Sequence, residues 1–125
     1  MAKRIYCIRG AVCAENTEAS IRENVGNMCR EIFSSNKIYS NDLVSIHFTM
    51  TRDLDVLNAA KALRLSDVGI DVTGTALFTS QEAEIKGMIP RTIRVMVSAY
   101  LEEGTQLHHV YQNGAEKLRP DFANK

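Results

Sequence analysis

Alternating apolar and polar positions predict two strands that are each buried on one face. The alternation runs through residues 44–50 and again through 92–100, with the period of two that a pleated strand imposes. The apolar positions are Val44, Ile46, Phe48, Met50, Ile93, Val95, Val97 and Ala99. Residues 5–14 are rich in β-branched and small side chains and predict a first strand, and residues 107–111 predict a last one.

A different apolar spacing predicts an amphipathic helix after the first strand. From Thr17 onward, apolar side chains recur at spacings of four, three and four residues, which places them in one stripe along a helix. The stripe consists of Ile21, Val25, Met28 and Ile32. Asn16 or Thr17 can cap the start of this helix, and residues 34–36 end it. Gly26 costs about 1 kcal/mol relative to alanine inside a helix, so tertiary packing has to support it.

A second, shorter helix is expected after the second strand. Thr51 or Asp53 can cap it, and it runs to about Leu65. Lys61 and Arg64 are three residues apart within it. Residues at that spacing are neighbours on a helix surface, so two cations share one side of this helix.

The remaining segments are short. Residues 70–72 and 76–78, separated by a glycine-containing turn, predict either two strands or one bulged strand. Asn113-Gly114 is a strong turn signal. We expect the polar tail from about residue 117 to be mobile. Without repeats or linkers, the chain is expected to form one domain over residues 1–125 with more strand than helix.

Composition and charge are typical of a single globular domain and argue against nucleic-acid and membrane partners. The chain has 125 residues, of which 45% are hydrophobic and 24% are charged, as is typical of such domains. Its 15 basic and 15 acidic side chains cancel, and a nucleic-acid partner usually requires a basic surplus. No apolar run approaches the roughly 18 residues of a transmembrane helix, so no membrane partner is expected.

Cysteine usage points to a reducing compartment. Cys7, Cys13 and Cys29 are odd in number and lack the spacing of a disulfide framework or a zinc ribbon. Two cations precede an apolar stretch near the start of the chain, as in a secretory signal, but Arg9 interrupts that stretch. We therefore expect a cytoplasmic protein.

The sequence lacks the common motifs of enzymatic chemistry. It contains no nucleophile elbow, phosphate-binding glycine loop, zinc-protease helix or calcium loop. His47, His108 and His109 match no zinc spacing, and nothing places a base beside Cys7 or Cys13. A metal site and covalent catalysis are both disfavoured.

What remains is a set of cations and one acid. They are Arg9, Lys61, Arg64, Arg94, Arg119 and Glu82. Arg94 is the most informative, because a guanidinium within the apolar run 93–97 must face either water or an anion. Taken singly, each of these side chains is also consistent with an ordinary solvated surface.

Six short blocks, which span nearly the whole chain, carry a resemblance. They are Ile8-Arg9-Gly10-Ala11, Thr51-x-Asp53-Leu54 followed by Ala60-Lys61-Ala62-x-Arg64, Gln81-Glu82, Ile93-Arg94-Val95-Met96, His109-Val110-Tyr111 and Leu118-Arg119-Pro120-Asp121. In this order they resemble the small monofunctional chorismate mutases, a family of homotrimers with active sites at subunit interfaces. No single block is specific, but collinear blocks that include every charged site position are hard to obtain by chance.

The resemblance implies both a fold and a reaction. The fold is a single α+β domain with a mixed five- to six-stranded sheet and two main helices on one face, assembled into a pseudo-α/β-barrel homotrimer. The reaction is the rearrangement of chorismate to prephenate, in which an ether carbon–oxygen bond breaks while a carbon–carbon bond forms. No cofactor, metal or nucleophile is needed. The protein holds the compact conformer of the substrate and places positive charge beside the ether oxygen.

The same resemblance implies roles for the charged residues. Arg94 would lie against the ether oxygen as the principal catalytic residue, with Arg9 and Glu82 as further catalytic residues. Arg9 and Tyr111 would bind the carboxylate of the enolpyruvyl group. Glu82 would accept a hydrogen bond from the ring hydroxyl, assisted by Thr79.

Other substrate-binding residues implied by the resemblance are Ala60, Lys61, Arg64 and Arg119. Lys61 and Arg64 would face the catalytic residues across a subunit interface, with Glu82 as a candidate partner of Arg64. Lys61 and Arg119 would be mobile cations at the mouth of the site. The chain departs from the family at Asn58, where a bulky apolar residue is usual, and at Thr79, which replaces a cysteine.

Two other functions remain open. A non-catalytic sensor of an aromatic-pathway carboxylate would use the same cations, because binding and catalysis draw on the same side chains. A trimeric enamine/imine deaminase would also hold a carboxylate with an interfacial arginine. The deaminase would not require the pair formed by Glu82 and Arg94.

Overall fold

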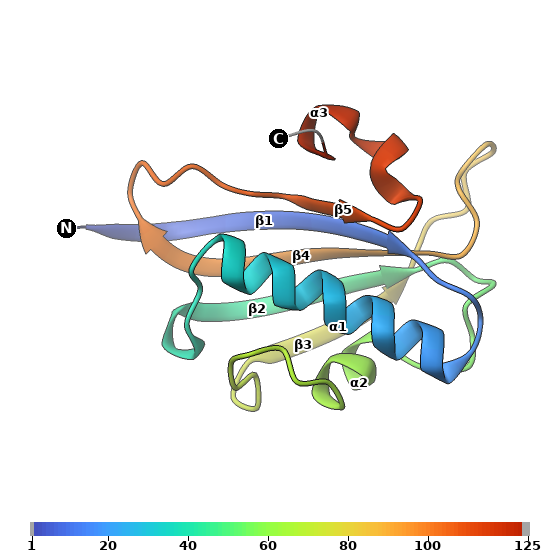
Figure 1. Cartoon of the computed structure of the whole chain (residues 1–125), viewed down its shortest axis with the longest axis horizontal. Coiled ribbons are helices and arrows are strands. Elements are labelled where there is room, and N and C mark those ends of the chain that lie inside the picture. Colours follow the sequence, from blue (N-terminus) through green and yellow to red (C-terminus); the bar gives the residue numbers. More distant parts are fainter. Residues whose placement is uncertain (1, 124–125) are drawn as a thin grey trace.

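A mixed five-stranded sheet organises the protein, and the computed structural model describes residues 2–123 of it (Figure 1). The elements in chain order are β1 (Lys3–Cys13), α1 (Glu18–Ser35), the 3-10 helix η1 (Ser40–Asp42), β2 (Leu43–Met50), α2 (Ala59–Arg64), β3 (Ala76–Gln81), β4 (Thr92–Glu102), β5 (Val110–Gln112), the 3-10 helix η2 (Ala115–Leu118) and α3 (Pro120–Ala123). The strand order is β3-β2-β4-β1-β5. β4 pairs antiparallel with β1 and β2, whereas β3 and β5 pair parallel with their neighbours.

Both main helices cover the same face of the sheet, as Figure 1 shows. The predicted stripe of α1 packs onto this face, and its four apolar residues are fully buried there. They meet inward-facing strand residues such as Ile8, Phe48 and Val97, which are also fully buried. Neither of these two helices covers the other face, which leaves Ile5, Met96 and other apolar side chains exposed. The predicted α+β fold with helices on one face is thus confirmed.

Helix α1 matches its prediction in detail. Thr17, rather than Asn16, is the cap, because its side chain accepts a hydrogen bond from the Ser20 backbone N–H at 3.1 Å. Gly26 lies where α1 contacts Ser66, two residues after the end of α2. A Cβ at this position would come within 3.1 Å of the Ser66 hydroxyl oxygen, so the close helix contact accounts for a glycine in mid-helix.

Strand β2 forms where alternation predicts it, but the predicted buried position of Val44 is wrong. A register shift between Leu43 and Ser45 interrupts its pairing with β4. Leu43 consequently packs against the core, while Val44 is 39% exposed. A bulge inverts the alternation at one point without altering the rest of the strand.

Helix α2 begins later than predicted. Its cap is Asn58, whose side-chain oxygen accepts from the Ala60 N–H at 2.8 Å. The two expected caps, Thr51 and Asp53, are used elsewhere: the Asp53 carboxylate accepts from the Thr51 hydroxyl at 2.6 Å and from the Arg91 N–H at 3.1 Å. These bonds connect the end of β2 to the start of β4. Asp53 therefore makes a long-range contact instead of capping a helix.

Two of the shorter predicted strands differ in the structure: the one at residues 70–72 does not form, and the one at 107–111 begins later. Residues 70–72 form a loop, in which the Asp71 carboxylate accepts from the Thr73 N–H at 2.9 Å, and only β3 follows. β5 begins at Val110 instead of Leu107. Before it, the Asn36 side chain bonds both backbone groups of His108, at 2.8 and 2.9 Å. The Asn36 side chain thus takes the place of a neighbouring strand as the hydrogen-bond partner of the His108 backbone.

The end of the chain folds back along β5. The predicted turn is present, with φ of 50° at Asn113 and 98° at Gly114, and η2 and α3 follow it. The expected mobility from about residue 117 stays a prediction, and residues 124–125 lie outside the described part. Among the helices of residues 2–123, none is long and apolar enough to cross a membrane.

Candidate active site

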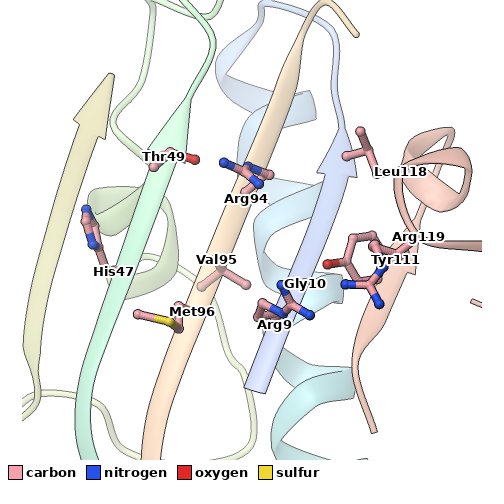
Figure 2. Close-up of a pocket in the computed structure, with 10 residues that line it drawn as sticks. All are labelled: Arg9, Gly10, His47, Thr49, Arg94, Val95, Met96, Tyr111, Leu118 and Arg119. Carbon is pink, nitrogen blue, oxygen red and sulfur yellow. The ribbon is translucent and has the colours of Figure 1, made fainter. Parts of the chain in front are cut away.

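The uncovered face of the sheet carries a pocket of about 320 Å³ (Figure 2). Its lining comes from four strands and the segment after them. The lining residues are Arg9, Gly10, His47, Thr49, Arg94, Val95, Met96, Tyr111, Leu118 and Arg119. Strand alternation explains the polar members of this set, because Arg9 on β1, Thr49 on β2 and Arg94 on β4 all occupy positions that point away from the core.

An arginine–glutamate pair lies at one side of this pocket. Glu82 directly follows β3, and its backbone N–H donates to the Met50 carbonyl at 2.7 Å. This bond continues the sheet and aims the Glu82 side chain at β4. The Arg94 guanidinium donates from Nε to Oε2 at 2.7 Å and from Nη2 to Oε1 at 2.8 Å. The pair is therefore bidentate, the strongest geometry between these groups.

The environment of the pair keeps both partners charged. The Glu82 side chain is 15% exposed and that of Arg94 is 55% exposed. The Arg94 guanidinium lowers the pKa of Glu82 below its usual value, and the Thr49 hydroxyl adds to that effect against the opposing burial. Glu82 in turn raises the pKa of Arg94. Glu82 is ionised at neutral pH, so it can accept hydrogen bonds but cannot donate them.

Two more arginines meet at the opposite rim, around the ring of Phe122. The Arg119 guanidinium lies 3.8 Å from the ring centroid and that of Arg9 lies 5.2 Å from it. His109 stacks on the same ring at 4.3 Å, and its Nδ1 accepts from the Arg9 backbone N–H at 2.9 Å. Arg119 is also held by Asp121 through two hydrogen bonds of 2.7 and 3.0 Å. The folded tail thus places cations at the pocket rim.

The pocket is suited to an anion with more than one carboxylate. Arg9, Arg94 and Arg119 all line it, and Tyr111 adds a phenol hydroxyl between them (Figure 2). Two acids beside the pocket are already paired with its arginines, Glu82 with Arg94 and Asp121 with Arg119. Within residues 2–123, no group of three or more histidine, cysteine or acidic side chains is placed to hold a metal ion.

One chain brings together only part of the predicted site. Arg9, Arg94, Tyr111 and Arg119 line the pocket, and Glu82 is bonded to Arg94. The other predicted residues, Thr79, Ala60, Lys61 and Arg64, do not line it. Thr79 pairs in register with Phe48 of the core, and its hydroxyl donates to the Asn58 side chain at 2.9 Å on the helix-covered side.

The structure also adds residues that the sequence reasoning missed. Thr49 donates to Glu82 Oε2 at 2.5 Å, and His47 lines the same wall and bonds the Ser80 hydroxyl at 2.9 Å. Leu118 covers the pocket from η2. The parity of Thr49 and His47 on β2 already put them on the polar face. Their proximity to Arg94 depends on strand register, which alternation alone does not reveal.

Comparison with known proteins gives a consistent result. The family model described as chorismate mutase type I matches residues 5–122. The chorismate mutase AroH of Thermus thermophilus is 31% identical over 118 residues, which cover 92% of this chain and 93% of that protein. The AroH of Bacillus subtilis is 30% identical over 118 residues, covering 93% and 91%. The solved chorismate mutase from Clostridium thermocellum superposes with a TM-score of 0.82 at 33% identity, covering 90% of this chain and 98% of that chain.

Proposed function

Because the chain belongs to the chorismate mutase type I family, whose members are isomerases, we propose that it rearranges chorismate to prephenate without a cofactor, with Arg94 as the principal catalytic residue. The observation that carries this proposal is the bidentate pair of Arg94 and Glu82 beside a pocket lined by further arginines. A metal ion and a nucleophile are not required, since the reaction moves electrons within one molecule.

Arg94 supplies the charge that the reaction needs. As the ether carbon–oxygen bond stretches, negative charge grows on the oxygen, and a fixed guanidinium stabilises it more in the transition state than in the ground state. Of the five N–H donors of an arginine, Glu82 takes one from Nε and one from Nη2. The donors that remain, including both on Nη1, can reach the ether oxygen and a carboxylate.

The other pocket residues would restrain the substrate. Arg9 and Tyr111 bind the enolpyruvyl carboxylate, and Arg119 adds a cation at the rim. Glu82 accepts a hydrogen bond from the ring hydroxyl. Holding both ends of a flexible dicarboxylate selects its compact conformer and removes the entropic cost of reaching it in the transition state.

A neighbouring copy of the chain would complete the site, as part of a homotrimer. Thr79, Ala60, Lys61 and Arg64 do not line the pocket of their own chain, so they can contribute only from another copy. The uncovered sheet face supports such an assembly, because Ile5, Phe78, Met96 and Tyr100 on it are 42–67% exposed. Apolar groups in such number on one face favour burial against a partner.

We further propose that the protein is cytoplasmic and that neither nucleic acid nor a membrane is its partner. The balanced charge and the three free cysteines support this setting. Both proposals can be checked by fractionating the cells that produce the protein.

The rearrangement is tested directly with purified protein and chorismate. We expect the ultraviolet absorbance of chorismate to fall without any added cofactor, and prephenate to appear in equal amount. Calorimetry on the same preparation measures binding separately. Folded protein that leaves chorismate unchanged would refute the mutase, and binding without turnover would identify a sensor instead.

A further inference from the structure

A hydroxyl on the pocket wall bonds the acid partner of Arg94. The Thr49 Oγ1 donates to Glu82 Oε2 at 2.5 Å, a short distance typical of a charge-assisted bond. Thr49 stands opposite Arg94 in the register of β2 and β4. Figure 2 shows its oxygen on the side of β2 that faces Arg94.

These contacts occupy the two carboxylate oxygens unequally. Among side-chain donors, Oε2 accepts from both Thr49 and Arg94 Nε, whereas Oε1 accepts from Arg94 Nη2. The Ala83 backbone N–H also bonds the carboxylate and lowers its pKa. An ionised carboxylate has about four acceptor positions, two on each oxygen. Because Thr49 and Arg94 Nε fill both positions on Oε2, a substrate hydroxyl can be accepted only on Oε1.

We propose that Thr49 is a positioning residue for the rearrangement: it saturates Glu82 Oε2, so that Oε1 alone meets the substrate hydroxyl and the carboxylate holds Arg94 in one orientation. This inference rests on the proposed function. Thr49 is suited to the role because a β-branched side chain in a strand has few rotamers. The nearby Ser80 hydroxyl, in contrast, is bonded to His47.

The kinetic test compares three single variants with the wild type. Thr49→Val keeps the shape but removes the donor, and we expect kcat to fall about tenfold with KM changed by less than about threefold. Thr49→Ser keeps the hydroxyl, so its kcat should stay within about threefold of the wild-type value. Ser98→Ala is the matched control, since it removes a hydroxyl from the neighbouring strand β4 that neither lines the pocket nor touches Glu82, and it should leave kcat unchanged.

A double variant separates action through Glu82 from direct action on the substrate. In a Glu82→Ala background, Thr49→Val should change kcat by less than about twofold relative to Glu82→Ala alone, because the Thr49 hydroxyl has lost its partner. A further tenfold loss in that background would overturn the proposal. So would a Thr49→Val enzyme with the wild-type kcat.

A second measurement does not depend on turnover. Carboxyl NMR of the folded protein should show the pKa of Glu82 higher in Thr49→Val than in the wild type, and unchanged in Thr49→Ser. Other charged or titratable groups around this face are common to all variants: Arg94 on β4, His47 on β2, Arg9 on β1, Tyr111 on β5, Arg119 after η2, and Glu84 and Lys86 in the loop after Glu82. An unshifted Glu82 pKa in Thr49→Val would refute the positioning role, whereas a wild type without activity would refute only the mutase.

Discussion

Replacing Arg94 is the most direct test of the charge that the site is built to supply. Arg94→Ala removes the guanidinium from the pocket and leaves Glu82 with Thr49 as its remaining side-chain donor. Arg94→Lys keeps a positive charge. A lysine, however, presents a single ammonium, which cannot bond both carboxylate oxygens side by side and still direct donors at an ether oxygen.

The size of the effect follows from the geometry. Loss of one preorganised donor to a developing oxyanion costs about 3–4 kcal/mol, or about 100- to 1,000-fold in rate. In the proposed mechanism Arg94 serves an ether oxygen and also orients Glu82, so we expect kcat to fall at least about 1,000-fold in Arg94→Ala. The folded state should lose little, because the Arg94 side chain is 55% exposed and exposed ion pairs contribute about 1 kcal/mol or less.

The assay measures kcat and KM for both variants, alongside urea unfolding and the oligomeric state. We expect Arg94→Lys to recover only a small part of the lost rate, which would separate directional hydrogen bonding from charge alone. Arg94→Ala with more than about a tenth of the wild-type kcat, in a folded protein of unchanged assembly, would show that the rate enhancement does not come from this side chain.

Three further predictions concern the surroundings of the site. Gly10→Ala should destabilise the protein and raise KM, because a Cβ there would lie 2.8 Å from the Val110 carbonyl oxygen and push β5 away. Urea unfolding measures the loss of stability. The control is Gly74→Ala, because a Cβ at Gly74 meets no atom within 4 Å. Phe122→Ala should raise KM about three- to tenfold with a smaller change in kcat, since the ring holds the two rim arginines by cation–π contacts; equal KM values would contradict this. The lowered pKa of Glu82 stabilises the fold above the ordinary glutamate pKa, and this contribution is lost as pH falls through the lower folded-state pKa. Glu82→Gln should therefore lose less stability than the wild type between about pH 5 and 3, and identical unfolding curves across that range would oppose it.

Local patterns sufficed for the long elements of this protein. The stripe of α1 and the alternation of β4 each involve residues close in sequence, and burial in the core enforces the same period in the folded chain. The charged residues Arg9, Arg94 and Glu82 could also be named from the sequence through their resemblance to a family. Their order along the chain carries that information without any knowledge of contacts.

Only the tertiary structure decided where hydrogen-bonding side chains act. Asp53 has the residue type of a helix cap, yet it accepts from the backbone N–H of Arg91 just before β4, and Asn36 replaces a strand partner for His108. Each of these bonds joins residues 38 or 72 positions apart. Propensity describes what a side chain can do locally and does not indicate which distant group competes for it.

The sequence by itself determined the residues from which a site could be built: cations on half-buried strands and a short helix, with one loop carboxylate, Glu82. Strand register determined its geometry, because it set Thr49 opposite Arg94 and brought Glu82 within reach of both. Register is fixed by the sum of many contacts between strands far apart in the chain. A one-residue slip would turn every one of these side chains to the other face, so the tertiary fold alone could specify their meeting.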